Sequence, residues 1–200
     1  RAIYEGMEMG RTVDESLAAF IAGVRSFYLA TASAAGQPYI QHRGGPPGFL
    51  HVVGERQLAF ADFKGNRQFI TTGNLAENPR AYIFLMDYAH RQRIKLWGTA
   101  RVVEGDAALE QSLMPEGYRA RSEQVILFEV AAWDSNCPQH IPQMFHADDV
   151  RQALDDATHR LPAGTVLLLD MSQLGSAPWT VLSAVGGGAM SLQVHFLRNR

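Results

Sequence analysis

The feature that most constrains the fold is a rhythm of short apolar runs separated by turn residues. Each run has the length of one β-strand, and glycine, proline or asparagine interrupts the chain after most of them. This rhythm is typical of an antiparallel sheet that curls into a barrel. It predicts seven strands, over residues 26–33, 38–43, 49–53, 57–62, 80–88, 93–104 and 124–134.

A first helix is predicted near the N-terminus, where Thr12 and Glu15 have the spacing of a capping box. The apolar side chains that follow share one helical face, formed by Leu17, Phe20, Ile21 and Val24. Further helices are predicted over residues 66–78, 107–113 and 147–160. The last is polar and amphipathic, and its apolar face consists of Val150, Leu154 and Ala157.

These elements predict a mainly β fold with flanking helices, in one domain over residues 1–161. The tail over residues 162–200 contains further apolar runs around the glycines at 186–188. This pattern fits either an edge hairpin or the start of another module.

Composition narrows the classes of partner. The net charge of −2 gives no reason to expect nucleic acid or an anionic membrane as partner. No apolar run approaches the roughly 20 residues that span a bilayer. A single cysteine, Cys137, excludes an intrachain disulfide, so the sequence favours a cytoplasmic protein.

The run FADFKGNRQFIT, residues 60–71, carries two cations where a strand gives way to a helical pattern. Asn66 is a good N-cap residue, and Gly65 allows a sharp turn. Lys64 and Arg67 would join the first N–H groups of the helix in an anion site that suits a phosphate. The alternative is that both side chains extend into water.

The run RQRIKLWG, residues 91–98, alternates in polarity. A barrel strand would turn Ile94 and Leu96 inward, and Arg93 and Lys95 would then lie on the outer wall. There they would face either solvent or an interface, where they could neutralise a bound anionic cofactor.

The loop after residue 43 is rich in glycine and proline, which force an irregular backbone that a ligand can approach closely. Gln41, His42 and Arg43 precede it and supply hydrogen-bonding groups. The loop matches neither a Walker sequence nor the G-x-G-x-x-G of dinucleotide sites.

The run WDSNCPQHIPQMF, residues 133–145, contains a cysteine and a histidine three residues apart. Without a second pair these two residues do not predict a metal site, and a small buried thiol is the simpler interpretation of Cys137. The segment is better interpreted as a lid over a ligand, formed by Trp133, Asn136, Cys137, Gln139 and His140.

The run LAFADFKGNRQFITTGNLAENPRAYIFLMDY, followed by RIKLWGTARVV, resembles the pyridoxamine 5'-phosphate oxidase-like FMN-binding split-barrel family. The loops RGGPPGF and WDSNCPQHIPQ are similar to those of its predicted flavin-nucleotide-binding subgroup. The resemblance covers about residues 12–145. It implies a six-stranded antiparallel split barrel that forms a homodimer and binds FMN at the subunit interface.

The resemblance also implies roles for individual residues, position by position. Lys64, Asn66 and Arg67 fall where family members hold the FMN phosphate, and Ala61 and Asp62 fall beside the ribityl chain or the ring edge. The strand that passes under the flavin ring carries Gln41, His42 and Arg43. The strand that reaches the flavin carries Arg93 and Lys95, which would stabilise the reduced, anionic ring.

Two departures separate this chain from the vitamer oxidase that gives the family its name. That enzyme has Ser-Arg-Lys where this chain has Asn66, Arg67 and Gln68. Lys64 is the candidate replacement for the missing cation. The substrate-binding C-terminal motif of that enzyme is not found in SLQVHFLRNR, so oxidation of pyridoxamine phosphate is not expected.

The sequence therefore predicts an FMN-dependent oxidoreductase for a small molecule, with NAD(P)H as a candidate electron donor. Three alternatives stay open. They are a non-catalytic flavin-binding or sensing protein, a haem-binding split barrel with His42 or His140 as ligand, and the flavin module of a larger electron-transfer protein.

Overall fold

A computed structural model describes residues 9–135, 139–159, 167–168 and 183–184. The chain divides into two compact units. Unit 1 comprises Arg1–Asp87 and Gln92–Pro138, and unit 2 comprises Tyr88–Arg91 and Gln139–Arg200. All seven strands of the large sheet belong to unit 1, whereas the turn between the fifth and sixth strands belongs to unit 2.

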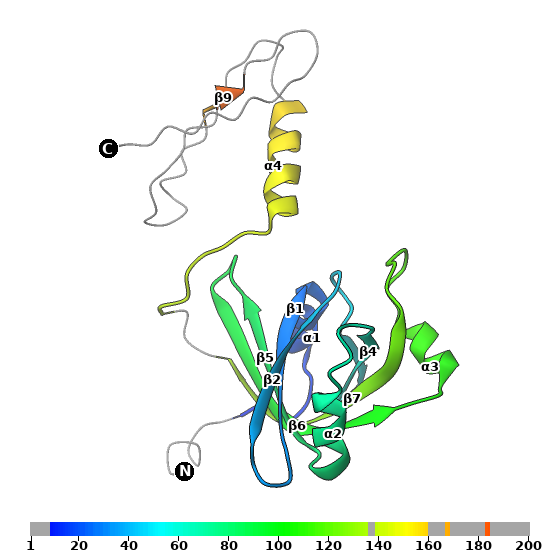
Figure 1. Ribbon diagram of the computed structural model, residues 1–200. Coiled ribbons are helices and arrows are strands. Elements are labelled where there is room, and N and C mark those ends of the chain that lie inside the picture. The colour runs from blue at the N-terminus through cyan, green and yellow to red at the C-terminus, as the bar shows by residue number, and fades with distance from the viewer. Residues whose placement is uncertain (1–8, 136–138, 160–166, 169–182, 185–200) are drawn as a thin grey trace. The chain divides into compact units, whose positions relative to one another are not determined.

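Unit 1 is built on one antiparallel sheet of seven strands, in the order β2-β1-β5-β6-β7-β4-β3 (Figure 1). All seven predicted strands are confirmed. The count of six that the resemblance implied is one too low, because the short strand β3 adds to the edge beside β4. The strands are β1 (Ser26–Ala32), β2 (Pro38–Gly44), β3 (His51–Gly54), β4 (Gln57–Phe63), β5 (Arg80–Asp87), β6 (Gln92–Val103) and β7 (Ser122–Ser135).

The interior of the barrel is filled by alternate side chains of these strands. Across β1, β5 and β6 the register places Leu29 beside Ile83, and Ile83 beside Leu96, and all three are fully buried. Ile94 is also buried. This confirms that Ile94 and Leu96 face inward, so Arg93 and Lys95 point to the outer wall.

The first helix, α1 (Glu15–Gly23), covers this core with Leu17 and Ile21. Its N-cap is Asp14 rather than Thr12, so the predicted capping box is wrong. The Asp14 carboxylate accepts hydrogen bonds from the Leu17 N–H and the Ser16 hydroxyl, which lower its pKa below the ordinary value of 3.8. The aspartate satisfies the open N–H group that a helix start leaves, two residues later than the sequence pattern indicates.

The helix predicted over 66–78 begins later, as α2 (Ile70–Glu77), so Asn66 is not its N-cap. Asn66 instead accepts a hydrogen bond from the Gln68 N–H (3.3 Å). The residues before the helix are held in an irregular loop, in which Arg67 and Phe69 have positive φ of 58° and 29°. The N-cap, Phe69, offers no side-chain hydrogen bond, so the first turn of α2 has no cap of its own.

The third helix, α3 (Ala107–Ser112), lies against β7, on the face that points away from the barrel interior. It borders a second, smaller apolar cluster outside the barrel interior, which includes Ala61, Leu113 and Val125. Two apolar clusters on opposite faces explain why β4 is buried at four consecutive positions instead of alternating.

Unit 2 contains the predicted polar helix as α4 (Ala147–His159), with Asp148 and Asp149 in its first turn. Two short strands, β8 (Leu167–Leu168) and β9 (Ser183–Ala184), pair antiparallel. The second arm of the hairpin predicted around the glycines lies outside the described residues. No helix of the described part of the chain is long and apolar enough to cross a membrane.

Gly98 lies at a β-bulge in the antiparallel pairing of β6 with β7, and a Cβ there would overlap the Glu129 carbonyl oxygen. We expect Gly98→Ala to lower the free energy of unfolding by about 3 kcal/mol or more, because backbone must move to admit the methyl group. Urea denaturation measures the loss.

Gly73→Ala is the matched control. This glycine is exposed within α2 and has nothing within 4 Å of its Cβ position, so the substitution is expected to stabilise by about 0.5–1 kcal/mol. Equal effects of the two substitutions would contradict the close approach of the β7 backbone to Gly98.

Candidate functional site

One ion pair joins the two ends of the sheet. Arg43 comes from the edge strand β2, and Asp62 comes from β4, next to the opposite edge. The two side chains form a salt bridge in which only 12% of one and 13% of the other is exposed. Since β2 and β4 share no backbone ladder among the sheet pairs, this contact closes the barrel across its split.

The carboxylate of this pair also accepts a hydrogen bond from Gln124 of β7. The residue is 4% exposed, and its Nε2 donates to Asp62 Oδ2 and to Thr72 Oγ1, both at 2.9 Å. Both amide protons of Gln124 are therefore used, one on the ion pair and one on α2.

The helix α2 lies beside the opening and is tied to the strands around it by polar side chains (Figure 1). Thr71 Oγ1 donates to Gln41 Oε1 of β2 at 2.9 Å, and Asn74 Nδ2 donates to Thr31 Oγ1 of β1 at 3.0 Å. The uncapped first turn of α2 is thereby fixed at the place where β2 and β4 approach each other.

These contacts surround a small hollow of about 40 Å³. A buried water needs about 10–15 Å³ of such space, so the hollow admits a group of a few atoms, such as a phosphate, and not a flavin ring. Its walls come from β2, β4, the loop before α2, the first turn of α2 and β7: Gln41, Arg43, Asp62, Phe63, Gly65, Asn66, Arg67, Gln68, Phe69, Thr71, Thr72 and Glu123.

The charges on the walls of the hollow form opposite pairs. Arg43 is paired with Asp62, and Arg67 Nε lies 3.6 Å from Glu123 Oε1. Arg67 is 62% exposed and also lies over the Phe69 ring, so its pair with Glu123 is a weak, solvent-screened one. Arg67 is therefore the cation of the hollow that an incoming anion can recruit.

The structure gathers five of the predicted cofactor residues around this hollow. Gln41 and Arg43 reach it from β2, Asp62 from β4, and Asn66 and Arg67 from the loop before α2. Lys64 lies just outside, exposed at the end of β4. The assignment of these residues to a cofactor stays a prediction.

The remaining predicted cofactor residues lie elsewhere in the chain. Ala61 is 2% exposed and packs in the cluster beside α3. His42, Arg93 and Lys95 lie on the outer face of the sheet, because their neighbours in sequence point inward. Within one chain, therefore, the outer-face residues do not join the hollow.

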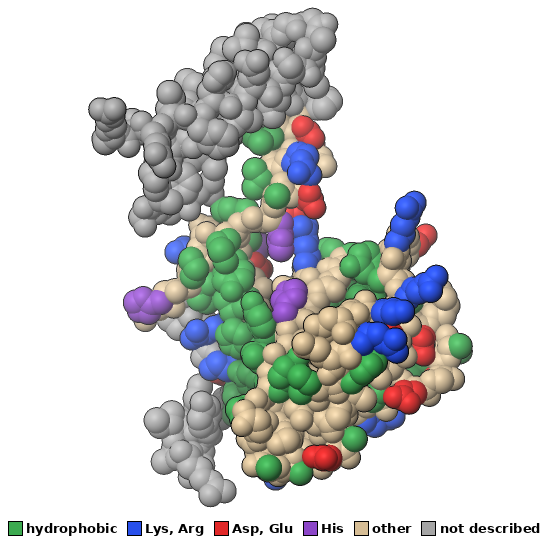
Figure 2. Space-filling view, in the orientation of Figure 1, with side chains coloured by type: hydrophobic (Ala, Val, Ile, Leu, Met, Phe, Trp, Pro, Cys, Tyr) green, Lys and Arg blue, Asp and Glu red, His purple; other side chains and the backbone are tan. Residues whose placement is uncertain are grey.

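The outer face of β2, β1, β5 and β6 is rich in aromatic side chains. Tyr28 packs edge-on against His42 with ring centroids 5.7 Å apart, and Tyr82 packs against Trp97 at 5.3 Å. Ile40 is 61% exposed on the same face. Figure 2 shows hydrophobic side chains gathered over this part of the sheet.

Of the predicted lid residues, only Trp133 lies among the described residues of unit 1. Trp133 Nε1 donates to the Thr12 carbonyl at 2.8 Å, and its ring lies against Gly10, where a Cβ would overlap it. Trp133 therefore fixes the segment around Gly10 and Thr12 against β7. Asn136 and Cys137 lie outside the described residues, and Gln139 and His140 belong to unit 2, so the lid stays a prediction.

Sequence reasoning missed four residues of the site: Thr71, Thr72, Glu123 and Gln124. The two threonines were hidden within a helical pattern and Gln124 at the start of an apolar strand. A polar residue that opens an otherwise apolar strand was the available signal for Gln124, because a buried amide needs hydrogen-bond partners.

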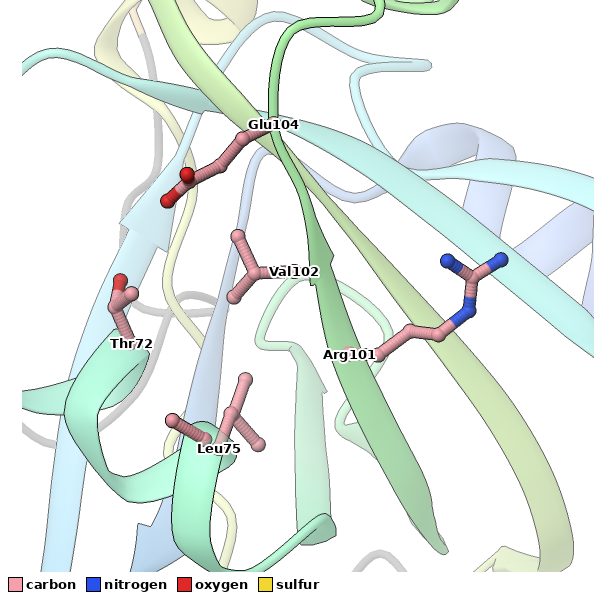
Figure 3. Close-up of a pocket in the computed structure, with 6 residues that line it drawn as sticks. Thr72, Leu75, Arg101, Val102 and Glu104 are labelled. Carbon is pink, nitrogen blue, oxygen red and sulfur yellow. The ribbon is translucent and has the colours of Figure 1, made fainter.

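A second, larger hollow of about 370 Å³ lies between α2 and the end of β6 (Figure 3). Leu75 and Val102 form its apolar part, and Arg101 and Glu104 stand at its border. Thr72 belongs to the walls of both hollows. Among the described residues, no group of three or more His, Cys, Asp or Glu is placed to hold a metal ion.

The smaller hollow fits the phosphate end of a flavin nucleotide. The first turn of α2 lacks a cap, and the N–H groups at a helix start favour an anion. Arg67 adds a guanidinium, and the buried Nε of Arg43 has no hydrogen-bond partner in the described structure. These groups could hold a phosphate, but the ring would have to lie outside.

Comparison with known families finds one match. The family model described as "Pyridoxamine 5'-phosphate oxidase" matches residues 13–137, more than half of the 200-residue chain. A search of curated proteins found no match. The matched range contains every strand of the seven-stranded sheet.

Several solved structures are similar to the chain. HupZ of Group A Streptococcus is 17% identical, with a TM-score of 0.47 over 61% of this chain and 92% of that one. An FMN-binding protein from Syntrophomonas wolfei is 11% identical, with a TM-score of 0.47 over 59% and 81%. The haem storage protein HutZ from Vibrio cholerae is 16% identical, with a TM-score of 0.43 over 59% and 89%.

Removing the charge of Asp62 tests the closure of the barrel. Asp62→Asn leaves the Arg43 guanidinium largely buried without its counter-charge, so we expect a loss of about 3 kcal/mol in the free energy of unfolding. Glu123→Gln is the control, because it makes the same change in a pair whose arginine is 62% exposed, and it is expected to cost less than about 1 kcal/mol. Similar small losses in both variants would show that the ion pair does not close the sheet.

Proposed function

The chain belongs to the pyridoxamine 5'-phosphate oxidase family, and on that basis we propose that it is an FMN-binding flavoprotein with oxidoreductase activity. The observation that carries the proposal is the hollow at the split of the barrel. It combines an uncapped helix start, a recruitable arginine and several hydrogen-bonding side chains within the matched range.

Within the hollow, each group has a separate task. Arg67 would leave its screened pair with Glu123 and present its guanidinium to two phosphate oxygens. Gln41 accepts from Thr71 through its Oε1, which leaves its amide NH₂ to donate to the ligand. Asp62 is held by Arg43 and Gln124, and its carboxylate would accept hydrogen bonds from ribityl hydroxyls.

We also propose a homodimer, because the flavin ring needs cover that the hollow does not supply. The outer face of β2, β1, β5 and β6 offers Tyr28, Tyr82, Trp97 and the exposed Ile40. An apolar, aromatic surface of this kind is typical of a subunit interface. In a dimer, Arg93 and Lys95 of one chain would serve the flavin held by the other.

Bound FMN would supply the redox chemistry by taking up and releasing two electrons. The protein binds it, orients it and sets the charge around it. The substrate is a small molecule, with a nicotinamide nucleotide as the candidate electron donor. Oxidation of pyridoxamine phosphate is not proposed, because Gln68 stands where that enzyme carries a phosphate-binding lysine.

Titration of the flavin-free protein with FMN tests the site. We expect Arg67→Ala to weaken FMN binding at least about tenfold, through loss of a charge-assisted, bidentate contact. Quenching of flavin fluorescence measures the dissociation constant. Arg101→Ala is the control, because Arg101 is another exposed arginine but borders the larger hollow. Full flavin occupancy of Arg67→Ala at limiting FMN would contradict the phosphate assignment.

Sedimentation tests the dimer. We expect Ile40→Asp to shift the protein toward monomer, because it places a carboxylate on the apolar surface, while the fold is kept since Ile40 is exposed. Val53→Asp changes a similarly exposed aliphatic residue on the edge strand β3 and should leave the dimer intact. A monomeric wild-type protein, or equal behaviour of both variants, would rule out this interface.

A further inference from the structure

A basic rim borders the phosphate hollow. The loop between α3 and β7 runs next to the end of β4, where the Lys64 N–H donates to the Arg121 carbonyl at 2.8 Å. Two residues further on, Glu123 forms part of the hollow's wall. Lys64, Arg119 and Arg121 therefore lie on the two segments that meet beside the hollow, and these three residues are named the basic rim.

The cations of the basic rim have no ion-pair partner in the part of the chain that the structure describes. All three side chains are exposed. The nearest acidic residues along the loop are Glu116, which is exposed, and Glu123, which is paired with Arg67. Figure 2 shows Lys and Arg side chains projecting on the side of unit 1 where this loop lies.

The unpaired positive charge of this region lies outside the hollow. Inside it, two arginines face two carboxylates, so a phosphate that enters gains contacts but little net attraction. The three cations of the basic rim have no ion-pair partner among the described residues. An anionic ligand is therefore attracted most strongly at the border of the hollow, just beyond the position of the first phosphate.

We propose that the basic rim is a second anion site, which holds a phosphate adjoining the one in the hollow. The two phosphates of a pyrophosphate share a bridging oxygen, so a ligand that places one in the hollow necessarily places the other next to it. The class of ligand that fits is a flavin dinucleotide, whose FMN phosphate occupies the hollow while the flavin ring lies outside it. This inference rests on the proposed function, because the FMN portion must bind first.

The alternative is that the basic rim is an ordinary solvated surface. The two possibilities differ in which anions the protein would bind more tightly. Solvated charges would attract all anions weakly and alike. A second phosphate site would favour FAD over FMN, and pyrophosphate over phosphate, and its contribution would fall steeply with salt.

The test is a titration of flavin-free protein with FMN and with FAD, at low and high salt, for the wild type and for Arg119→Gln/Arg121→Gln. We expect the wild type to bind FAD about tenfold more tightly than FMN at low salt, an advantage that the double variant loses. FMN affinity should change less than about twofold in that variant. Arg101→Gln is the matched control, since it removes an exposed arginine that does not border the hollow formed by Arg67 and Glu123.

The outcomes separate this inference from the proposed function. Equal affinities for FMN and FAD, or a double variant that weakens both alike, would overturn the second anion site and leave FMN binding standing. Failure of both flavins to bind would overturn the proposed function itself. Displacement of FAD by inorganic pyrophosphate, but not by the same concentration of inorganic phosphate, would support the paired site independently.

Discussion

The buried pair of Arg43 and Asp62 is the contact on which the rest of the site depends. It joins the two ends of an open sheet that no backbone ladder closes. Because it is shielded from solvent, its charges must be satisfied locally, and Gln124 does so for the carboxylate. Gln124 also binds Thr72, so the start of α2 is fixed by the same network that closes the barrel. Structure and site are thus coupled, because the hollow exists only where the sheet ends meet.

The fold was readable from sequence because its signals are local. Alternation in β1 and β6, turn residues between strands and the inward Ile94 and Leu96 depend on nearest neighbours along the chain. Helix starts were read less well. Thr12 and Asn66 are both good capping residues, yet neither caps a helix, because caps depend on where the backbone turns and not on side-chain chemistry alone.

The site could be predicted from the sequence only in part, because its contacts join segments that are far apart in the chain. Gln41, Arg43, Asp62, Asn66 and Arg67 line one hollow, because β2, the end of β4 and the loop before α2 meet at the split. The Arg43 partner could not be foreseen, since pairing between β2 and β4 is set by the closure of the sheet. Arg93 and Lys95 on β6 are also cations that the sequence assigned to the cofactor, but they point away from the hollow. Only a second subunit would bring them to it.

The central claim is that this hollow holds the phosphate of a flavin. The most direct measurement compares the affinities of the flavin-free protein for FMN and for riboflavin, which share the ring and ribityl chain and differ only in the phosphate. The account predicts that FMN binds at least about a hundredfold more tightly, as expected for several charge-assisted hydrogen bonds. Equal affinities, or a protein that binds neither flavin and shows a haem absorption band instead, would contradict it.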